Sequence, residues 1–122
     1  MNKQKTALRK TADSLFSKVI LARDRYCLIC GLFAYDAHHI IPRSLSEYLR
    51  YDTLNGVGLC RNDHIKIEDR NPFTLEILSK KLGEERINYL TMRRRDMVVL
   101  NVSYLEESIE RLTRELKRNI SH

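Results

Sequence analysis

Long apolar segments are absent from this sequence of 122 residues. A membrane-spanning helix needs about 20 consecutive apolar residues, and no run approaches that length, so we expect no membrane partner. The first residues, MNKQKTALRK, have no apolar block behind their charges, which is unlike a secretory signal. Hydrophobic residues still make up 43% of the chain, which favours a folded protein over a disordered one. These features together predict a cytoplasmic protein.

Cysteine and histidine are also scarce, with three and four copies. Three cysteines cannot form a closed set of disulfides. Cys27 and Cys30 are two residues apart, and Cys60 follows thirty residues later. In a cytoplasmic chain this spacing favours a metal site over a disulfide. Half of the histidines, His38 and His39, are adjacent within the segment DAHHIIP, where a strand is expected.

Charge is distributed unevenly along the chain, which has 22 basic and 16 acidic residues and a net charge of +6. Residues 1–26 hold seven basic and two acidic side chains, whereas residues 27–70 hold five and six. A near-neutral centre beside a basic segment fits an enzyme that binds a polyanion around a central cation. A solvated surface with surplus lysine is the plainer alternative.

The hydrophobic pattern predicts an α+β fold that is mostly helical, with residues 1–122 forming a single domain. Apolar residues recur at steps of three and four over Thr6–Arg25, which predicts a basic N-terminal helix within residues 1–25. The other faces of this helix carry its basic residues.

Residues 71–122 are predicted to form a helical C-terminal extension. Pro72 suits the first turn of a helix, and Gly83 would end that helix before the next one begins. Ser103 followed by Glu106 has the pattern of a capping box, which predicts the start of the last helix.

The segment before the last helix, Met97–Val102, is apolar and predicts a short strand or a buried loop. The last helix itself has apolar residues at coiled-coil spacing over about two heptads. This favours packing onto its own domain over a dimer seam, so monomer and homodimer both stay open.

The middle of the chain, residues 26–70, predicts a ββα unit. The segment YCLICG is too short for a helix and ends in glycine, which indicates a knuckle. A strand is expected over Leu32–Ile41, because aromatic and β-branched residues are frequent there and Pro42 follows. Leu54–Cys60 contains two glycines and predicts a turn with a return strand. A helix over 61–70 completes the unit.

The motifs CLIC, DAHHIIP, NGVGLC and NDH, in this order, resemble the HNH endonucleases of the ββα-metal nuclease class. The resemblance covers residues 26–70 and is carried by His39, Asn55 and His64. A wider order is similar to the phage recombination endonucleases of the NinG/Rap family: a helix ending in LARDRYC, the knuckle, the HHI strand, and an NPF helix followed by a Gly-led helix. These resemblances imply that the protein is a metal-dependent DNA endonuclease in a bacterial or phage-infected host cell.

The resemblance also implies roles for individual residues. His39 would be the general base that activates water, and the reference pKa of histidine, about 6.5, suits that task. His38 and His64 would bind the metal ion, while Asn55 would hold the connecting loop and orient the His39 ring through a hydrogen bond. Glu68 lies four residues after His64 on the same helix face and is a third candidate ligand or a surface glutamate.

One divalent metal ion would bind the scissile phosphate and the leaving 3′ oxygen, giving 5′-phosphate and 3′-hydroxyl ends. The residue types do not select between Mg²⁺, Mn²⁺, Ni²⁺ and Zn²⁺. The substrate would be duplex or branched DNA. Arg43, which follows the proline, and the run Arg93, Arg94 and Arg95 are expected to contact the DNA backbone. Solvent exposure alone is the alternative for these arginines.

The knuckle departs from the family pattern, in which four cysteines usually occur. The place of the last cysteine is taken by Asp63. Carboxylates do bind zinc, so Cys27, Cys30, Cys60 and Asp63 are expected to form a structural zinc site. The alternative is a metal-free knuckle held by the packing of buried thiols.

Two other functions compete with the nuclease. The first is a catalytically inactive zinc-knuckle module that only binds nucleic acid. The second is a protein unrelated to nucleic acids, in which zinc merely staples a small fold. The histidines and Asn55 argue against the first, and the basic N-terminal segment argues against the second.

Overall fold

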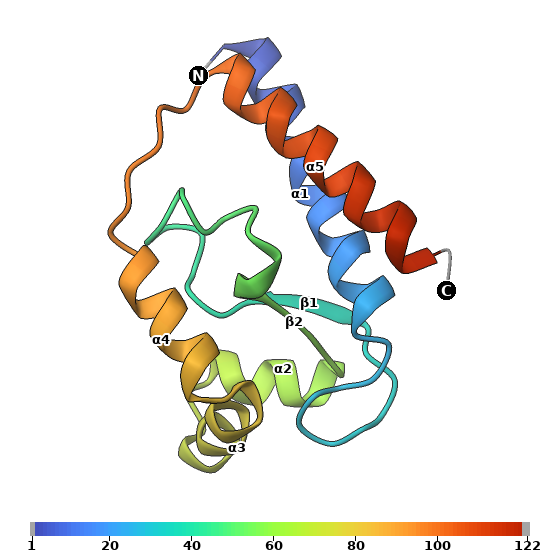
Figure 1. Cartoon of the computed structure of the whole chain (residues 1–122). Coiled ribbons are helices and arrows are strands. Elements are labelled where there is room, and N and C mark those ends of the chain that lie inside the picture. Colours follow the sequence, from blue (N-terminus) through green and yellow to red (C-terminus); the bar gives the residue numbers. More distant parts are fainter. Residues whose placement is uncertain (1, 121–122) are drawn as a thin grey trace.

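The computed structural model of the protein describes residues 2–120, and within this range it contains five α-helices and one two-stranded sheet (Figure 1). The predicted class, α+β and mostly helical, is therefore confirmed. None of the helices in this range combines the length and the apolar character that crossing a bilayer requires. The elements in chain order are α1 (Lys3–Arg23), β1 (Asp36–His39), the 3₁₀ turn η1 (Thr53–Asn55), β2 (Gly56–Leu59), α2 (Arg61–Glu68), α3 (Pro72–Leu82), α4 (Glu84–Arg93) and α5 (Val102–Ile120).

The two longest helices, α1 and α5, lie side by side and form one hydrophobic core (Figure 1). Phe16 and Ile20 of α1 are buried there against Leu105 and Leu112 of α5. The apolar stripe of the last helix thus packs onto its own chain, as its short length predicts. Burying these side chains contributes about 1.5–3 kcal/mol each to the stability of the helix pair.

The sheet separates this core from a second one. β1 and β2 pair antiparallel, with His38 opposite Val57 and His39 opposite Gly56. Because side chains alternate along a strand, His39 faces α1 and His38 faces the opposite side. Val57 belongs to the second core, together with Ile67 of α2 and Leu78 of α3. The two adjacent histidines therefore lie on different faces of one strand.

Glycine in β2 allows α1 to approach the sheet closely. A Cβ atom on Gly56 would lie 2.5 Å from Ile20 Cδ1 and 2.6 Å from Phe16 Cζ. A Cβ on Gly58 would lie 2.7 Å from the Asp24 carbonyl oxygen. These separations are too short for any side chain, so α1 lies directly against the backbone of β2.

Local capping chemistry sets the limits of the central helices. Cys60 caps α2 by accepting a hydrogen bond from the backbone N–H of Asp63, and Asn71 caps α3. Pro72 occupies the first turn of α3, where its missing N–H costs nothing. Gly83 lies between α3 and α4 with φ +87°, a conformation that favours glycine. The predicted breaks at Pro72 and Gly83 are confirmed.

Two predictions about the last connection are wrong. Residues 96–100 form an irregular segment rather than a strand or a buried loop, and Met97 is 91% exposed. The cap of α5 is Asn101 instead of Ser103, because Asn101 Oδ1 accepts the N–H of Tyr104 at 2.8 Å. Asparagine caps helices as well as serine does, and with Asn101 as its cap α5 begins at Val102, before the predicted start.

The strand expected over 32–41 is shorter in the structure. β1 covers only Asp36–His39, and the preceding residues form an isolated antiparallel bridge between Tyr26 and Phe33. Figure 1 shows this knuckle segment as a loop beyond the C-terminal end of α1. The partner strand β2 has only four residues, which limits the ladder that β1 can form.

Candidate metal centres and catalytic cleft

An open cleft of about 920 Å³ lies between the sheet and helices α1 to α4. His38 and His39 of β1 and His64 of α2 all line it. His38 and His39 lie on opposite faces of β1, yet both border this cleft, which strict alternation would not predict. All three histidines with predicted roles thus meet at one place.

His38, His64 and Glu68 form a group that we call the imidazole cluster. His64 Nε2 lies 3.1 Å from Glu68 Oε1, and His38 Nδ1 lies 3.6 Å from the same oxygen. Ligands at about 2.1 Å from a divalent ion lie about 3.0–3.4 Å apart, so these spacings suit a shared ion. His38 and His64 are half-buried, whereas Glu68 is exposed at the rim. Nitrogen and carboxylate donors fit Zn²⁺, Mn²⁺, Ni²⁺ and Mg²⁺.

Asp36 orients the imidazole cluster, a role that the sequence reasoning missed. Its Oδ2 lies 3.1 Å from His64 Nδ1, and its Oδ1 lies 3.3 Å from an Arg61 nitrogen. A carboxylate on the far nitrogen of a ligating histidine fixes the ring and raises its basicity. Asp36 precedes His38 by two residues on one strand, and that period-2 spacing places it on the face of His38.

Electrostatics keep both strand histidines neutral near pH 7. Burial lowers the pKa of His38 to about 4, and the nearby His64 adds to this effect while Glu68 opposes it. Burial also lowers the pKa of His39, against the hydrogen bond to the Arg50 carbonyl. Burial alone would raise the pKa of Asp36, but hydrogen bonds from His64 and Arg61 lower it. Neutral imidazoles beside an ionised carboxylate form a set that can accept a cation or a proton.

His39 is held apart from the imidazole cluster. Its ring stacks on Phe16 of α1, with the ring centroids 4.4 Å apart and the planes 12° from parallel. His39 Nε2 lies 3.0 Å from the backbone oxygen of Arg50. A carbonyl only accepts, so Nε2 carries the proton and Nδ1 is left as the basic atom. Arg50 is itself anchored to α1 by two hydrogen bonds to Asp13, of 3.0 and 2.8 Å.

Asn55 holds the connecting loop but does not orient the His39 ring, so that part of the prediction is wrong. Asn55 is completely buried. Its Oδ1 accepts the N–H of Ile41 at 2.8 Å, and its Nδ2 donates to the carbonyls of Ile41 and Leu49 at 3.0 and 3.2 Å. The amide therefore ties together the two ends of the loop after β1. The ring partner, a backbone carbonyl eleven residues from His39, has no side-chain signature in the sequence.

The arginines expected to contact DNA lie in different surroundings. Arg43 and Arg94 line the cleft, and Arg43 is half exposed with one nitrogen 3.7 Å from Asp13. Arg93 pairs with Asp96 at 3.2 Å, while Arg95 is exposed. Arg43 and Arg94 therefore border the histidines, whereas Arg93 and Arg95 lie outside the lining of this cleft.

A second group, which we call the thiol cluster, comprises Cys27, Cys30, Cys60 and Asp63. The sulfurs of Cys30 and Cys60 lie 3.7 Å apart. Asp63 Oδ2 lies 3.3 Å from the sulfurs of both Cys27 and Cys60. Ligands of a tetrahedral zinc, with sulfur at about 2.3 Å and oxygen at about 2.0 Å, lie about 3.5–3.8 Å apart. The four side chains therefore have the spacing and chemistry of a Cys₃Asp zinc site.

With only its own charges present, the thiol cluster keeps Cys30 and Cys60 protonated and Asp63 ionised. The Leu32 backbone hydrogen bond would lower the pKa of Cys30, but the Asp63 carboxylate, burial and the other thiols raise it to about 12. Burial raises the pKa of Cys60 as well. Asp63 is 7% exposed, yet hydrogen bonds from the thiols keep its pKa low despite burial. A cation among these groups would lower the pKa values of the thiols, since zinc-bound thiols are deprotonated.

Comparison of the chain with protein-family models, with curated proteins and with solved structures gave no match.

Proposed function

We propose that this chain is a metal-dependent endonuclease of the HNH type that hydrolyses phosphodiester bonds in DNA. One observation carries the proposal: His39 borders the same cleft as the imidazole cluster but does not belong to it. Hydrolysis of a phosphodiester needs a base for water and a cation for the phosphate, and the two must be adjacent but separate.

His39 serves as the general base in this proposal. The Arg50 carbonyl holds the Nε2 proton, so Nδ1 accepts a proton from water. Stacking on Phe16 fixes the ring plane, and the lowered pKa of His39 keeps the ring unprotonated at neutral pH. α1 therefore supports the base through both Phe16 and the Asp13–Arg50 pair.

The imidazole cluster holds the catalytic metal in this proposal. His38, His64 and Glu68 bind the ion, and Asp36 orients His64. When bound, a divalent ion neutralises charge on the scissile phosphate and on the leaving 3′ oxygen. Arg43 and Arg94 attract the phosphate backbone toward the cleft. The products are 5′-phosphate and 3′-hydroxyl ends.

The thiol cluster holds a structural zinc ion in the same proposal. Cys27 and Cys30 come from the knuckle, while Cys60 and Asp63 come from the start of α2. Zinc would thus fasten the knuckle to the helix that carries His64. Closed four-ligand sites of this kind stabilise folds rather than catalyse reactions.

The test is cleavage of supercoiled plasmid in Mg²⁺ or Mn²⁺, compared between the wild type and His39→Ala. We expect the wild type to nick or linearise the plasmid and the variant to be about 10²–10⁴-fold slower, since a general base contributes that factor. Gel-shift measurements should show that His39→Ala still binds DNA. Glu76→Ala, which removes an exposed carboxylate from α3, is the control and should cleave normally.

The alternative is the inactive binding module, which the thiol cluster supports by itself because a zinc knuckle needs no base. Wild-type protein that shifts DNA in gels but leaves it intact with every divalent ion would establish that alternative. A protein that neither binds nor cuts DNA would exclude both.

A further inference from the structure

Three aromatic side chains form an exposed surface on the knuckle, which we call the knuckle face: Tyr26, Phe33 and Tyr35. Their exposed fractions are 66%, 56% and 64%. Tyr26 and Phe33 are opposite each other in an antiparallel bridge, and Phe33 and Tyr35 are two residues apart. Both relations place side chains on one face. The rings of Phe33 and Tyr35 meet edge to face at 4.8 Å.

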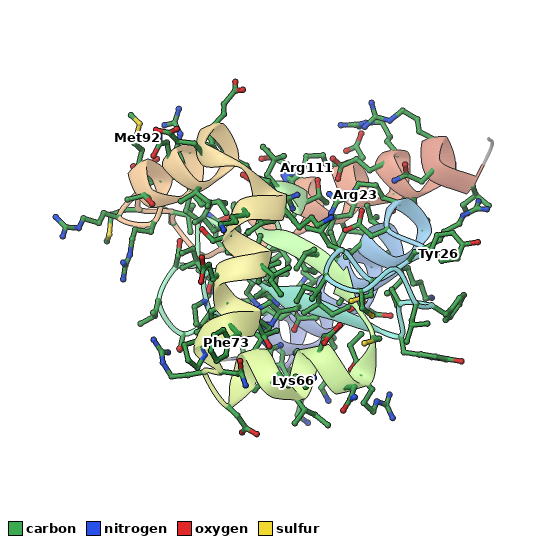
Figure 2. All side chains as sticks on the ribbon, turned by 90° about the horizontal axis from the view of Figure 1, so that it is seen from below. Arg23, Tyr26, Lys66, Phe73, Met92 and Arg111 are labelled. Atoms are coloured by element: carbon green, nitrogen blue, oxygen red, sulfur yellow. The ribbon has the colours of Figure 1, made fainter. Side chains whose placement is uncertain are left out.

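The knuckle face belongs to neither hydrophobic core, and Figure 2 shows Tyr26 at the periphery of the molecule. Two exposed arginines belong to, or pair with, the chain segments around it. Arg25 is exposed, and its carbonyl accepts the N–H of the residue between Phe33 and Tyr35. Arg61, which pairs with Asp36 directly after Tyr35, is 73% exposed. Arg25 therefore contributes a positive charge directly before Tyr26 in the chain, whereas the charge of Arg61 is shared with Asp36.

Acidic side chains near the knuckle face are already engaged. The Asp24 carboxylate accepts two hydrogen bonds from Arg23, of 2.7 and 2.8 Å. The Asp36 carboxylate is shared between His64 and Arg61. The surface thus combines exposed rings and positive charge, while its nearest carboxylates are neutralised by cationic or hydrogen-bonding partners. This combination suits a chain that carries both flat bases and phosphates.

We propose that the knuckle face binds an unpaired DNA strand, with bases stacked on Phe33 and Tyr35 and a phosphate on Arg25. In a duplex the bases are stacked on each other, so exposed rings at a surface select unpaired nucleotides. Tyr35 precedes His38 by three residues of extended chain, about 10 Å. A strand of several nucleotides on the knuckle face is therefore long enough to reach the cleft, and the inference rests on the proposed function in this one respect.

The experiment measures binding in the full-length His39→Ala protein by anisotropy of a labelled oligo-dT strand and of a labelled duplex. Adding Phe33→Ala with Tyr35→Ala should weaken binding of the single strand by about tenfold for each ring lost. Binding of the duplex should change little. Tyr35→Phe keeps the ring and should bind the single strand as tightly as the parent.

Phe73→Ala is the matched control, because Phe73 is 76% exposed on α3 and lies well apart from Tyr26 in Figure 2. It should leave both affinities unchanged. A second readout is the salt dependence of binding: Arg25→Gln should reduce the slope of log K against log salt by about 0.7, whereas the ring substitutions should leave it unchanged. Zinc content and melting temperature confirm that each variant is folded.

Equal loss of affinity for single strand and duplex, or no loss in the double variant, would overturn the inference. An oligo-dT strand that the parent does not bind would overturn it too, and would leave a polypeptide as the class of partner for the knuckle face. Failure of the proposed function has a different signature. A wild-type protein that binds the single strand through Phe33 and Tyr35 but cuts no DNA would contradict the proposed nuclease activity and would support single-strand binding by the knuckle face.

Discussion

The thiol cluster and the imidazole cluster are built from the same helix but differ in every property that matters for a metal ion. The thiol cluster has three sulfurs and one oxygen, and only Cys30 of its four residues is exposed. The imidazole cluster has two nitrogens and one oxygen, borders an open cleft and has an exposed carboxylate. Structural zinc sites use four protein ligands, whereas catalytic sites keep a position open for substrate. Ligand count and access thus distinguish the two neighbouring groups and are consistent with the different tasks proposed for them.

The position of the ligands on α2 explains how one short helix serves both clusters. Asp63 and His64 are adjacent in sequence, and about 100° of rotation per residue directs them to different sides of the helix. Asp63 is buried against the knuckle, while His64 borders the cleft. The following predictions test whether the two clusters are as different as their chemistry indicates.

The largest expected effect separates the carboxylates of the two clusters. Asp63→Ala should lose bound zinc and about 3 kcal/mol of stability, or about 10–15 °C in melting temperature. Removing a buried carboxylate that two thiols hydrogen-bond costs about 1–3 kcal/mol even without a metal, so the loss of bound zinc, rather than the loss of stability, decides whether Asp63 is a ligand. Atomic absorption and thermal unfolding measure both quantities.

Glu68→Ala is the matched control for this prediction, because it removes a carboxylate from the same helix but from the other cluster. It should keep its zinc and its melting temperature. Unchanged zinc stoichiometry in Asp63→Ala would show that Asp63 is not a ligand and that the two clusters differ less than proposed.

Acid should act on the imidazole cluster through His38, whose pKa is lowered to about 4 in the folded protein. Between about pH 6.5 and 4 the unfolded chain binds a proton at this residue that the folded chain does not. The free energy of unfolding should therefore fall as the pH falls, by about 1.4 kcal/mol per unit and up to about 3 kcal/mol in all.

Urea unfolding of zinc-loaded protein at pH 7.5, 6.5 and 5.5 measures this slope, with His38→Gln as the comparison. The variant has no titrating group at residue 38 and should lose less stability between pH 6.5 and 5.5. Identical slopes would mean that His38 titrates normally in the folded protein.

The smallest expected effect concerns Asp36, which contacts the metal only through His64. Asp36→Asn should weaken Mn²⁺ binding at the imidazole cluster by about 10–100-fold. Zinc bound by the thiol cluster should not change. Isothermal titration of zinc-loaded protein with Mn²⁺ gives the affinity, and Asp69→Asn, an exposed change just after α2, should match the wild type. Equal Mn²⁺ affinity in both variants would show that Asp36 does not orient His64 for metal binding.

Features governed by neighbouring residues could be predicted from the sequence. Pro72 and Gly83 mark helix limits because backbone chemistry acts locally, and the candidate ligands of both clusters stand out because histidine and cysteine are rare. The cap at Asn101 was missed although it is equally local, because Ser103 with Glu106 offered a competing pattern.

Features that depend on the meeting of distant segments could not be predicted. The Arg50 carbonyl orients His39, yet any residue type supplies a carbonyl, so the sequence carries no sign of it. The sequence indicates only that Phe16 is a core residue, and its stacking on the His39 ring becomes evident in the folded structure. The exposure of Phe33 also could not be predicted, because an aromatic residue in a strand pattern is expected to be buried.

The length of α2 has a practical consequence for work with chelators. Its eight residues fall short of the roughly 12–15 at which an isolated helix becomes even marginally stable in water. If zinc occupies the thiol cluster and a second ion occupies the imidazole cluster, EDTA would remove both. The loss of zinc would then destabilise α2, which positions His64. Loss of cleavage in EDTA alone would then say nothing about which ion matters. Recovery would require a fixed order of addition, zinc first and magnesium second, and reversing that order would be the informative experiment.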